Sequence, residues 1–229
     1  MKNIFFFFVL FLSIGHLSAQ PIDDVFGSTI SMVDIGIFDS RATPSSLLKK
    51  KTNLQNNTYL FQRFENGSVI NNKNKRYSAH VNFDLLSGKL LIQDKNGIWA
   101  IYDGEIKYVE TTNRKFIFLE YKKKNGFLEV LTSKKIALLK KWSIFQKMDT
   151  SNPLVAANEL HRTYSKKSIL YYYSPKFRKA KKLPTKFSKF LAIFEKQQQA
   201  MDKYIKQNNL SFKKEKDLVD IFTYYSTLQ

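Results

Sequence analysis

The sequence predicts an α+β protein in which an antiparallel, β-rich meander is followed by two C-terminal helices. Three observations carry this prediction: short runs of alternating apolar and polar residues between 58 and 183, turn-forming dipeptides between those runs, and helical periodicity after Pro184. Apolar residues make up 43% of the chain, which is sufficient for a packed core. For 229 residues, one domain, or one domain with a small appendage, is the natural expectation.

The N-terminus has the pattern of a secretory signal peptide. Lys2 supplies a positive start, residues 4–14 form an apolar run, and a short polar stretch ends in Ala19. A small side chain is needed before the cleavage point, so we expect residues 1–19 to be removed and Gln20 to begin the mature chain. The alternative, an uncleaved anchor, is disfavoured because the apolar run is shorter than the roughly 20 residues that span a bilayer. With no cysteine for lipid attachment, a periplasmic or secreted protein is predicted.

Residues 20–57 have no sustained periodicity and are predicted to form an irregular leader into the β-rich domain at 58–183. From Tyr77 onward, Val81 and Phe83 alternate with polar residues that include His80, Asn82 and Asp84. This alternation predicts a half-buried strand whose polar side faces solvent. Further strands are predicted at 89–93, 98–102, 106–109, 115–121, 127–132, 135–139 and 169–173, with a short helix at 154–161.

Glycines support the antiparallel arrangement because they follow turn-prone residues. Such dipeptides supply the positive φ angles of tight hairpins. Connections this short do not hold the crossover helices of a parallel, nucleotide-binding sheet. The predicted turns are Asn66-Gly67, Ser87-Gly88, Asn96-Gly97, Asp103-Gly104 and Asn125-Gly126.

The C-terminal region, residues 184–229, is predicted to be a helical pair packed on the sheet. One apolar stripe runs from Phe187 to Ile205, and Asn208-Asn209 interrupts it. A second stripe contains Leu218, Phe222 and Tyr225, with acidic residues near its N-terminal end, where the helix dipole favours them.

Four motifs carry a resemblance to a known family: YLFQRFENGSV, RKFIFLEY, NGFLEVL followed by KKIALLKK, and NNLSFKKEKDLVDIFTYYSTL. Together they cover most of the predicted mature chain, and they resemble a family of exported, uncharacterised proteins of Bacteroidota. The motifs are strands and helix starts and contain no catalytic signature. The resemblance implies export and a β-rich fold with C-terminal helices, and it implies no established activity.

The residues offer little support for catalysis or for a cofactor. The absence of cysteine excludes thiolate metal sites and cysteine nucleophiles. His80 and His161, the histidines that follow the signal peptide, lack the spacing of a zinc protease. Asp103 and Glu105 flank a glycine, which is typical of an exposed turn and not of a glycosidase pair. No phosphate-binding glycine loop and no calcium loop is present, so we predict no metal and no cofactor.

One segment stands out by its charge, in a chain of net charge +19. Between Glu159 and Glu195 there is no acidic residue, and aromatic residues such as Tyr171 and Tyr172 interleave with the bases. Charge combined with ring faces is a common way to hold polyanions; the alternative is a solvated lysine face over core tyrosines. The candidate polyanion-binding residues are Arg162, Lys166, Lys167, Lys176, Arg178, Lys179, Lys181, Lys182, Lys186 and Lys189.

These observations favour an exported, non-enzymatic binding or interaction protein of the cell envelope. Its expected partners are anionic envelope polymers such as lipopolysaccharide or acidic polysaccharide, with peripheral membrane contact as a further option and no specific nucleic acid. Two alternatives stay open. An enzyme with a hidden site would gather a histidine and carboxylates in a cleft, and a structural component of an envelope assembly would expose an apolar patch.

Overall fold

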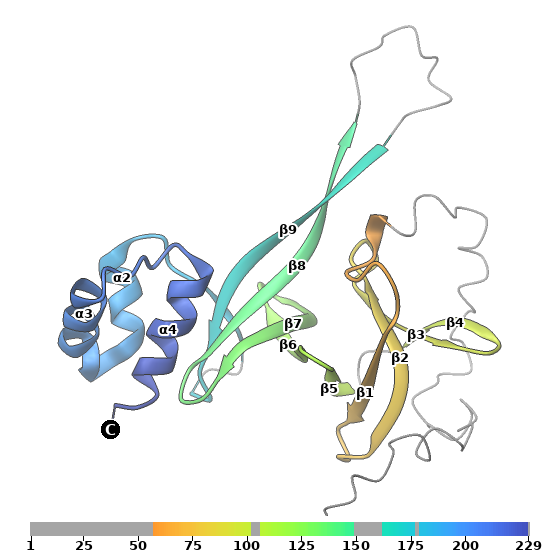
Figure 1. The fold of residues 1–229 in the computed structure, drawn as a ribbon, viewed down its shortest axis with the longest axis horizontal. Coiled ribbons are helices and arrows are strands. Elements are labelled where there is room, and N and C mark those ends of the chain that lie inside the picture. The colour runs from red at the N-terminus through yellow and green to blue at the C-terminus, as the bar shows by residue number, and fades with distance from the viewer. Residues whose placement is uncertain (1–56, 102–105, 149–161, 177–178, 229) are drawn as a thin grey trace, which may run out of the picture.

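A computed structural model describes residues 57–101, 106–148, 162–176 and 179–228. The predicted signal peptide with its cleavage point, nearly all of the predicted leader, and the predicted short helix at 154–161 lie outside these residues. The described chain forms one ten-stranded sheet followed by C-terminal helices, which lie beside the lower ends of β7, β8 and β9 in Figure 1. This confirms the predicted α+β class and the antiparallel, β-rich arrangement.

The strand order is β10-β9-β8-β7-β6-β5-β1-β2-β3-β4, and every neighbouring pair is antiparallel. All neighbours are also consecutive in the chain except β1 and β5, so most of the sheet is the predicted meander. The strands are β1 (Glu65–Asn71), β2 (Arg76–Asp84), β3 (Lys89–Asp94), β4 (Gly97–Ile101), β5 (Ile106–Thr111), β6 (Lys115–Tyr121), β7 (Lys124–Ser133), β8 (Ala137–Met148), β9 (Arg162–Tyr173) and β10 (Lys181–Lys182).

The C-terminal helices follow the predicted stripes. Residues 187–207 are helical on both sides of a break at Glu195, and comprise α2 (Phe187–Leu191), the 3₁₀ segment η5 (Ala192–Gln197) and α3 (Gln198–Gln207). The chain is kinked at this residue, whose backbone has φ 49° and ψ −118°. After the break at Asn208-Asn209, α4 (Glu215–Tyr225) completes the pair. Glu215 and Asp217 lie in the first turn of α4, where their negative charges interact favourably with the positive end of the helix dipole.

Buried side chains form three apolar clusters. The first joins β1–β3 to β5–β7 and includes Val81, Phe83, Leu90, Val109 and Phe116. The second packs the helices on the ends of β8 and β9, and the third lies on the opposite face of β6–β9. The second includes Leu138, Phe190, Phe194, Met201, Leu218, Ile221 and Phe222, and the third includes Leu128, Ala137, Leu139, Tyr171 and Ala180.

The part of the sheet from β6 to β10 is curled around the third cluster. Ala180, directly before β10, donates its N–H to the Glu120 carbonyl at 2.8 Å, and it forms a parallel bridge with Tyr121 of β6. Two strands, β7 and β8, separate β6 from β9 within the sheet, yet the rings of Tyr121 and Tyr171 lie 5.6 Å apart. The two margins of this part of the sheet therefore meet, and its concave face is apolar.

The prediction that the polar residues of β2 face solvent is only partly right. His80 is exposed as expected, but Asn82 and Asp84 are buried. The reason is the segment 58–64, which crosses the end of β2: Asn82 Oδ1 accepts the Phe61 N–H at 3.1 Å, and Asn82 Nδ2 donates to the Phe61 carbonyl at 3.0 Å. Leu60 of this segment donates its N–H to the Phe83 carbonyl at 2.9 Å, and at Phe61 the buried backbone groups are satisfied by the Asn82 amide.

Two of the predicted turns, Asn66-Gly67 and Asn125-Gly126, are also wrong. Gly67 lies inside β1, where a β-carbon would approach the Glu110 carbonyl to 2.5 Å, so close strand packing explains this glycine. Gly126 lies inside β7, and the hairpin turns at Lys122-Lys123, which have φ 43° and 61°. The turn at Ser87-Gly88 is confirmed, Gly97 opens β4 directly after its turn, and the predicted Asp103-Gly104 turn lies outside the described residues.

Candidate functional site

The structure divides the candidate basic segment into separate places. Lys166 and Lys167 lie on β9, in the half of the strand that is remote from the helices. Lys181 of β10 pairs with Tyr172, which lies at the opposite end of β9. Along a strand, the six positions between Lys166 and Tyr172 span about 20 Å. Arg178 and the side chain of Arg162 lie outside the described part of the chain. The ten bases therefore do not converge on one point.

The two lysines of β9 have local contacts. Lys166 Nζ donates to the Leu60 carbonyl at 3.0 Å, and loss of hydration there lowers the pKa of Lys166. Lys167 Nζ lies 4.0 Å from the centre of the Phe145 ring on β8, within the range of a cation–π contact. Lys166 therefore contacts the segment 58–64, and Lys167 contacts the neighbouring strand β8.

Lys176 is paired with the acid that ends the acid-free segment. Its Nζ lies 2.9 and 2.7 Å from the two carboxylate oxygens of Glu195, and these hydrogen bonds raise the pKa of Lys176. Glu195 is the residue at the helix kink, and its positive φ is uncommon for a residue with a β-carbon. Both side chains are exposed, so solvent screens the pair.

The remaining lysines gather at the end of the sheet where β10 leads into α2. Four of them, Lys179, Lys182, Lys186 and Lys189, are exposed, and we call this set the lysine edge. None of the four has an ion-pair partner among the described residues. Lys181 is left out of this set because it is half-buried and its side chain or backbone already interacts with another group. The lysine edge is the part of the candidate segment that presents uncompensated positive charge.

Aromatic residues of the same segment belong mainly to the core. Tyr171 is 1% exposed and packs in the third cluster, and Tyr172 and Phe187 pack against the second. Burial raises the pKa of Tyr171 and of Tyr172. The ring of Tyr171 has no free face for a ligand, so charge, rather than stacking, dominates this surface.

Residues considered for catalysis do not converge. His80 is exposed on β2 and faces Asn66 and Gln93 on the neighbouring strands. His161, Asp103 and Glu105 lie outside the described residues. Within those residues, no group of three histidine, aspartate or glutamate side chains is arranged to hold a metal ion.

One buried polar network was missed by the sequence analysis. Glu129 on β7 accepts a hydrogen bond from Trp142 Nε1 at 2.5 Å and lies 3.6 Å from Arg114 Nε. Next to it on β8, the buried Lys140 reaches Glu215 at the start of α4, at 2.5 Å. No signal marks these residues, because charges alternating with apolar residues also occur on exposed strands. The network ties α4 to the sheet.

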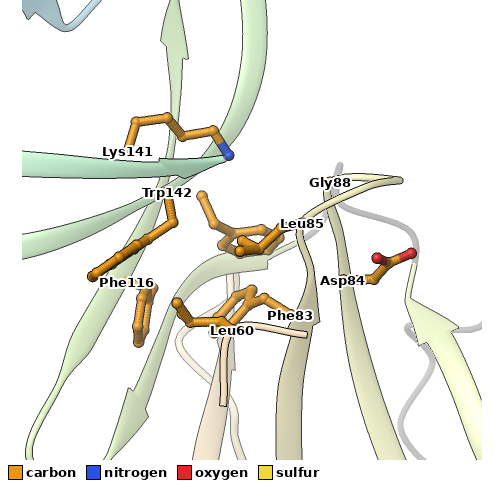
Figure 2. Close-up of a pocket in the computed structure, with 9 residues that line it drawn as sticks. Leu60, Phe83, Asp84, Leu85, Gly88, Phe116, Lys141 and Trp142 are labelled. Carbon is orange, nitrogen blue, oxygen red and sulfur yellow. The ribbon is translucent and has the colours of Figure 1, made fainter. Parts of the chain in front are cut away.

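Figure 2 shows a junction between the β2 region and β6–β8, where Leu60, Phe83, Phe116 and Trp142 converge. Its cavity is about 10 Å³, which is the space of one water molecule. Asp84 points away from these side chains and accepts hydrogen bonds from Ser87. The junction is packed core and holds no ligand pocket.

Two larger cavities lie nearer the helices. One of about 140 Å³ is lined by Ile136, Tyr172, Ser174, Lys189, Ala192, Ile193 and Glu195, and one of about 220 Å³ is lined by Lys115, Ile117, Val130, Ser133, Lys134, Ala137, Tyr173 and Pro175. Neither is lined by a histidine or by a pair of carboxylates.

Comparison with known proteins gives no match to a family model, a curated protein or a solved structure. The resemblance to exported Bacteroidota proteins therefore stays a prediction. In the described part of the chain, no helix has both the length and the apolar character needed to cross a bilayer.

Proposed function

We propose that this protein is a non-enzymatic binding protein that contacts anionic polymers of the cell envelope through the lysine edge. The observation that carries the proposal is the position of Lys179, Lys182, Lys186 and Lys189, which are exposed on one continuous stretch and have no described acidic partner. Lipopolysaccharide phosphates and acidic polysaccharide have the complementary charge.

The chemistry of the lysine edge defines the kind of binding. Lysine is a hydrated point charge on a flexible stem and lacks the planar fork with which arginine recognises phosphate. Contacts of this kind act through long-range attraction and counterion release. We expect binding that falls steeply with salt and depends little on the fine structure of the polymer.

The other two function classes have less support. Neither of the larger cavities is lined by a histidine or by a pair of carboxylates, the residues that the enzyme alternative predicts in a cleft. Among the described residues, the large apolar side chains that are exposed are Leu86, in a turn after β2, and Phe145, on β8 beneath Lys167. They belong to different elements and do not form the apolar patch that an assembly surface would need.

The test is retention on immobilised heparin and on purified lipopolysaccharide. A variant with Lys179, Lys182, Lys186 and Lys189 all changed to Glu is expected to elute at clearly lower ionic strength than the wild type. A matched variant reverses four exposed lysines elsewhere, namely Lys73, Lys75, Lys95 and Lys203. Both variants have the same net charge, so a difference between them reports the position of the charges.

Two outcomes would contradict the proposal. If the two variants elute together, the lysine edge is not the binding face. If the wild type is not retained near physiological salt, polyanion binding is not the function, and the excess lysine serves solubility.

We also propose that the chain is exported and processed, which rests on the apolar run at 4–14 and the small residue Ala19. Mass spectrometry of the protein recovered from the periplasm or medium is expected to find Gln20 at the N-terminus, in free or cyclised form. Recovery of a chain that retains Met1 would refute cleavage.

A further inference from the structure

The cavity of about 220 Å³ lies on the concave face of the curled sheet, between the ends of β6, β7, β8 and β9. Its walls come from Ile117, Val130, Ala137 and Tyr173, which all belong to or pack against the third cluster. Register supports this placement, because Ala137 pairs with Tyr173 across β8 and β9. Pro175 closes one side.

The space is large enough for a small organic molecule. An apolar cavity of about 150 Å³ in another protein holds benzene, so 220 Å³ has room for an apolar chain of about eight carbons. Pockets of this kind, with apolar walls and a few polar groups at the mouth, are the usual form of small-molecule sites.

Two lysines and a hydroxyl define the polar end of the cavity. Lys115 is committed to other groups, because its Nζ lies 2.9 Å from a Glu110 oxygen and 3.8 Å from the centre of the Tyr108 ring. Lys134, in the turn between β7 and β8, is exposed and has no ion-pair partner in the described part of the chain. Ser133 adds a hydroxyl beside it. The mouth of the cavity therefore carries one uncommitted positive charge.

We propose that this cavity binds a small amphiphile with an apolar chain of about eight carbons and a single anionic head group. The chain lies against Ile117, Val130 and Ala137, and the head group is held by Lys134 with the Ser133 hydroxyl. A cationic head is disfavoured by the two lysines. The site is separate from the lysine edge and does not depend on the proposed function.

The test uses octanoate and octanol as probes, titrated into the wild-type protein by calorimetry and followed by NMR shifts of Ala137 and Tyr173. Octanoate is expected to bind more tightly than octanol, since the two share a chain and differ in head-group charge. Lys134→Glu is expected to weaken octanoate binding about two- to fivefold, in line with the loss of one exposed ion pair, and to leave octanol binding unchanged. Lys95→Glu, in the distant β3–β4 turn, is the charge-matched control and is expected to change neither.

A second variant tests the apolar part of the site. Ala137→Leu places extra carbons inside the cavity and is expected to weaken both probes, with thermal unfolding used to verify that the variant is folded. The proposal would be overturned if octanoate did not bind, or if octanoate and octanol bound with equal affinity. It would also be overturned if Lys134→Glu bound octanoate as tightly as the wild type. Because the heparin test uses other residues, its failure would leave this result unaffected.

Discussion

Phe222→Ala is expected to lower the free energy of unfolding by about 3–5 kcal/mol. Phe222 is 1% exposed in α4, and its ring centre lies 5.5 Å from that of Phe194 and 6.3 Å from that of Phe190. Removing the ring leaves a cavity in the middle of the second cluster, where three helical segments and β8 meet. Urea unfolding of the purified protein measures the change.

The control for this variant is Thr223→Ala, which lies next to Phe222 but is exposed. Its effect is expected to stay within about 0.5 kcal/mol. A loss below about 1 kcal/mol for Phe222→Ala would mean that α4 does not contribute to the core, and the docking of the helices would have to be revised.

Asn82→Leu is expected to destabilise the protein by about 2–4 kcal/mol, although leucine has a similar size and is apolar. The Asn82 amide is fully buried and bonds the backbone of Phe61 through both its oxygen and its nitrogen, with a further bond to the Arg63 carbonyl at 3.3 Å. The substitution leaves these backbone groups buried without partners, at a cost of about 1–3 kcal/mol for each group that water does not reach.

Two measurements separate this effect from a general loss of stability. Urea unfolding gives the free energy, and limited trypsin digestion reports the segment 58–64, where Arg63 is exposed. We expect cleavage after Arg63 to be faster in Asn82→Leu than in Ser78→Ala, a variant of an exposed residue on the same strand. Equal cleavage rates and equal stability in the two variants would refute the role of Asn82 in holding the segment 58–64.

The lysines of β10 have a structural role that is compatible with binding. β10 is an edge strand of two residues, and short, lysine-bearing edges prevent pairing with another sheet. Lys182 is exposed on this edge and Lys181 is half-buried, whereas polyanion binding is proposed for the whole lysine edge.

The amino-acid sequence determined the elements in which local pattern and burial agree. β6 runs from Lys115 to Tyr121 as predicted, and the apolar stripes of 187–207 and α4 form the second cluster. In these elements, side chains that share a face in the local period also share the core. The segment without acidic residues between Glu159 and Glu195 could also be found from the sequence, because it is read directly from the order of the residues.

Tertiary structure alone decided the features that depend on contacts between distant segments. β8 continues to Met148 and β9 begins at Arg162, so both strands are much longer than predicted. The two strands stay paired over their full length, although the sequence of the added part does not alternate between apolar and polar residues. Asn82 is buried because another segment crosses it. The basic residues were predicted as one surface. In the structure, Lys166 lies near the start of β9 and the lysine edge follows the end of this strand, so the two are far apart. Lys176 forms an ion pair with Glu195, which lies later in the chain. Local pattern defines which face a residue takes, and only the packed fold defines what lies opposite it.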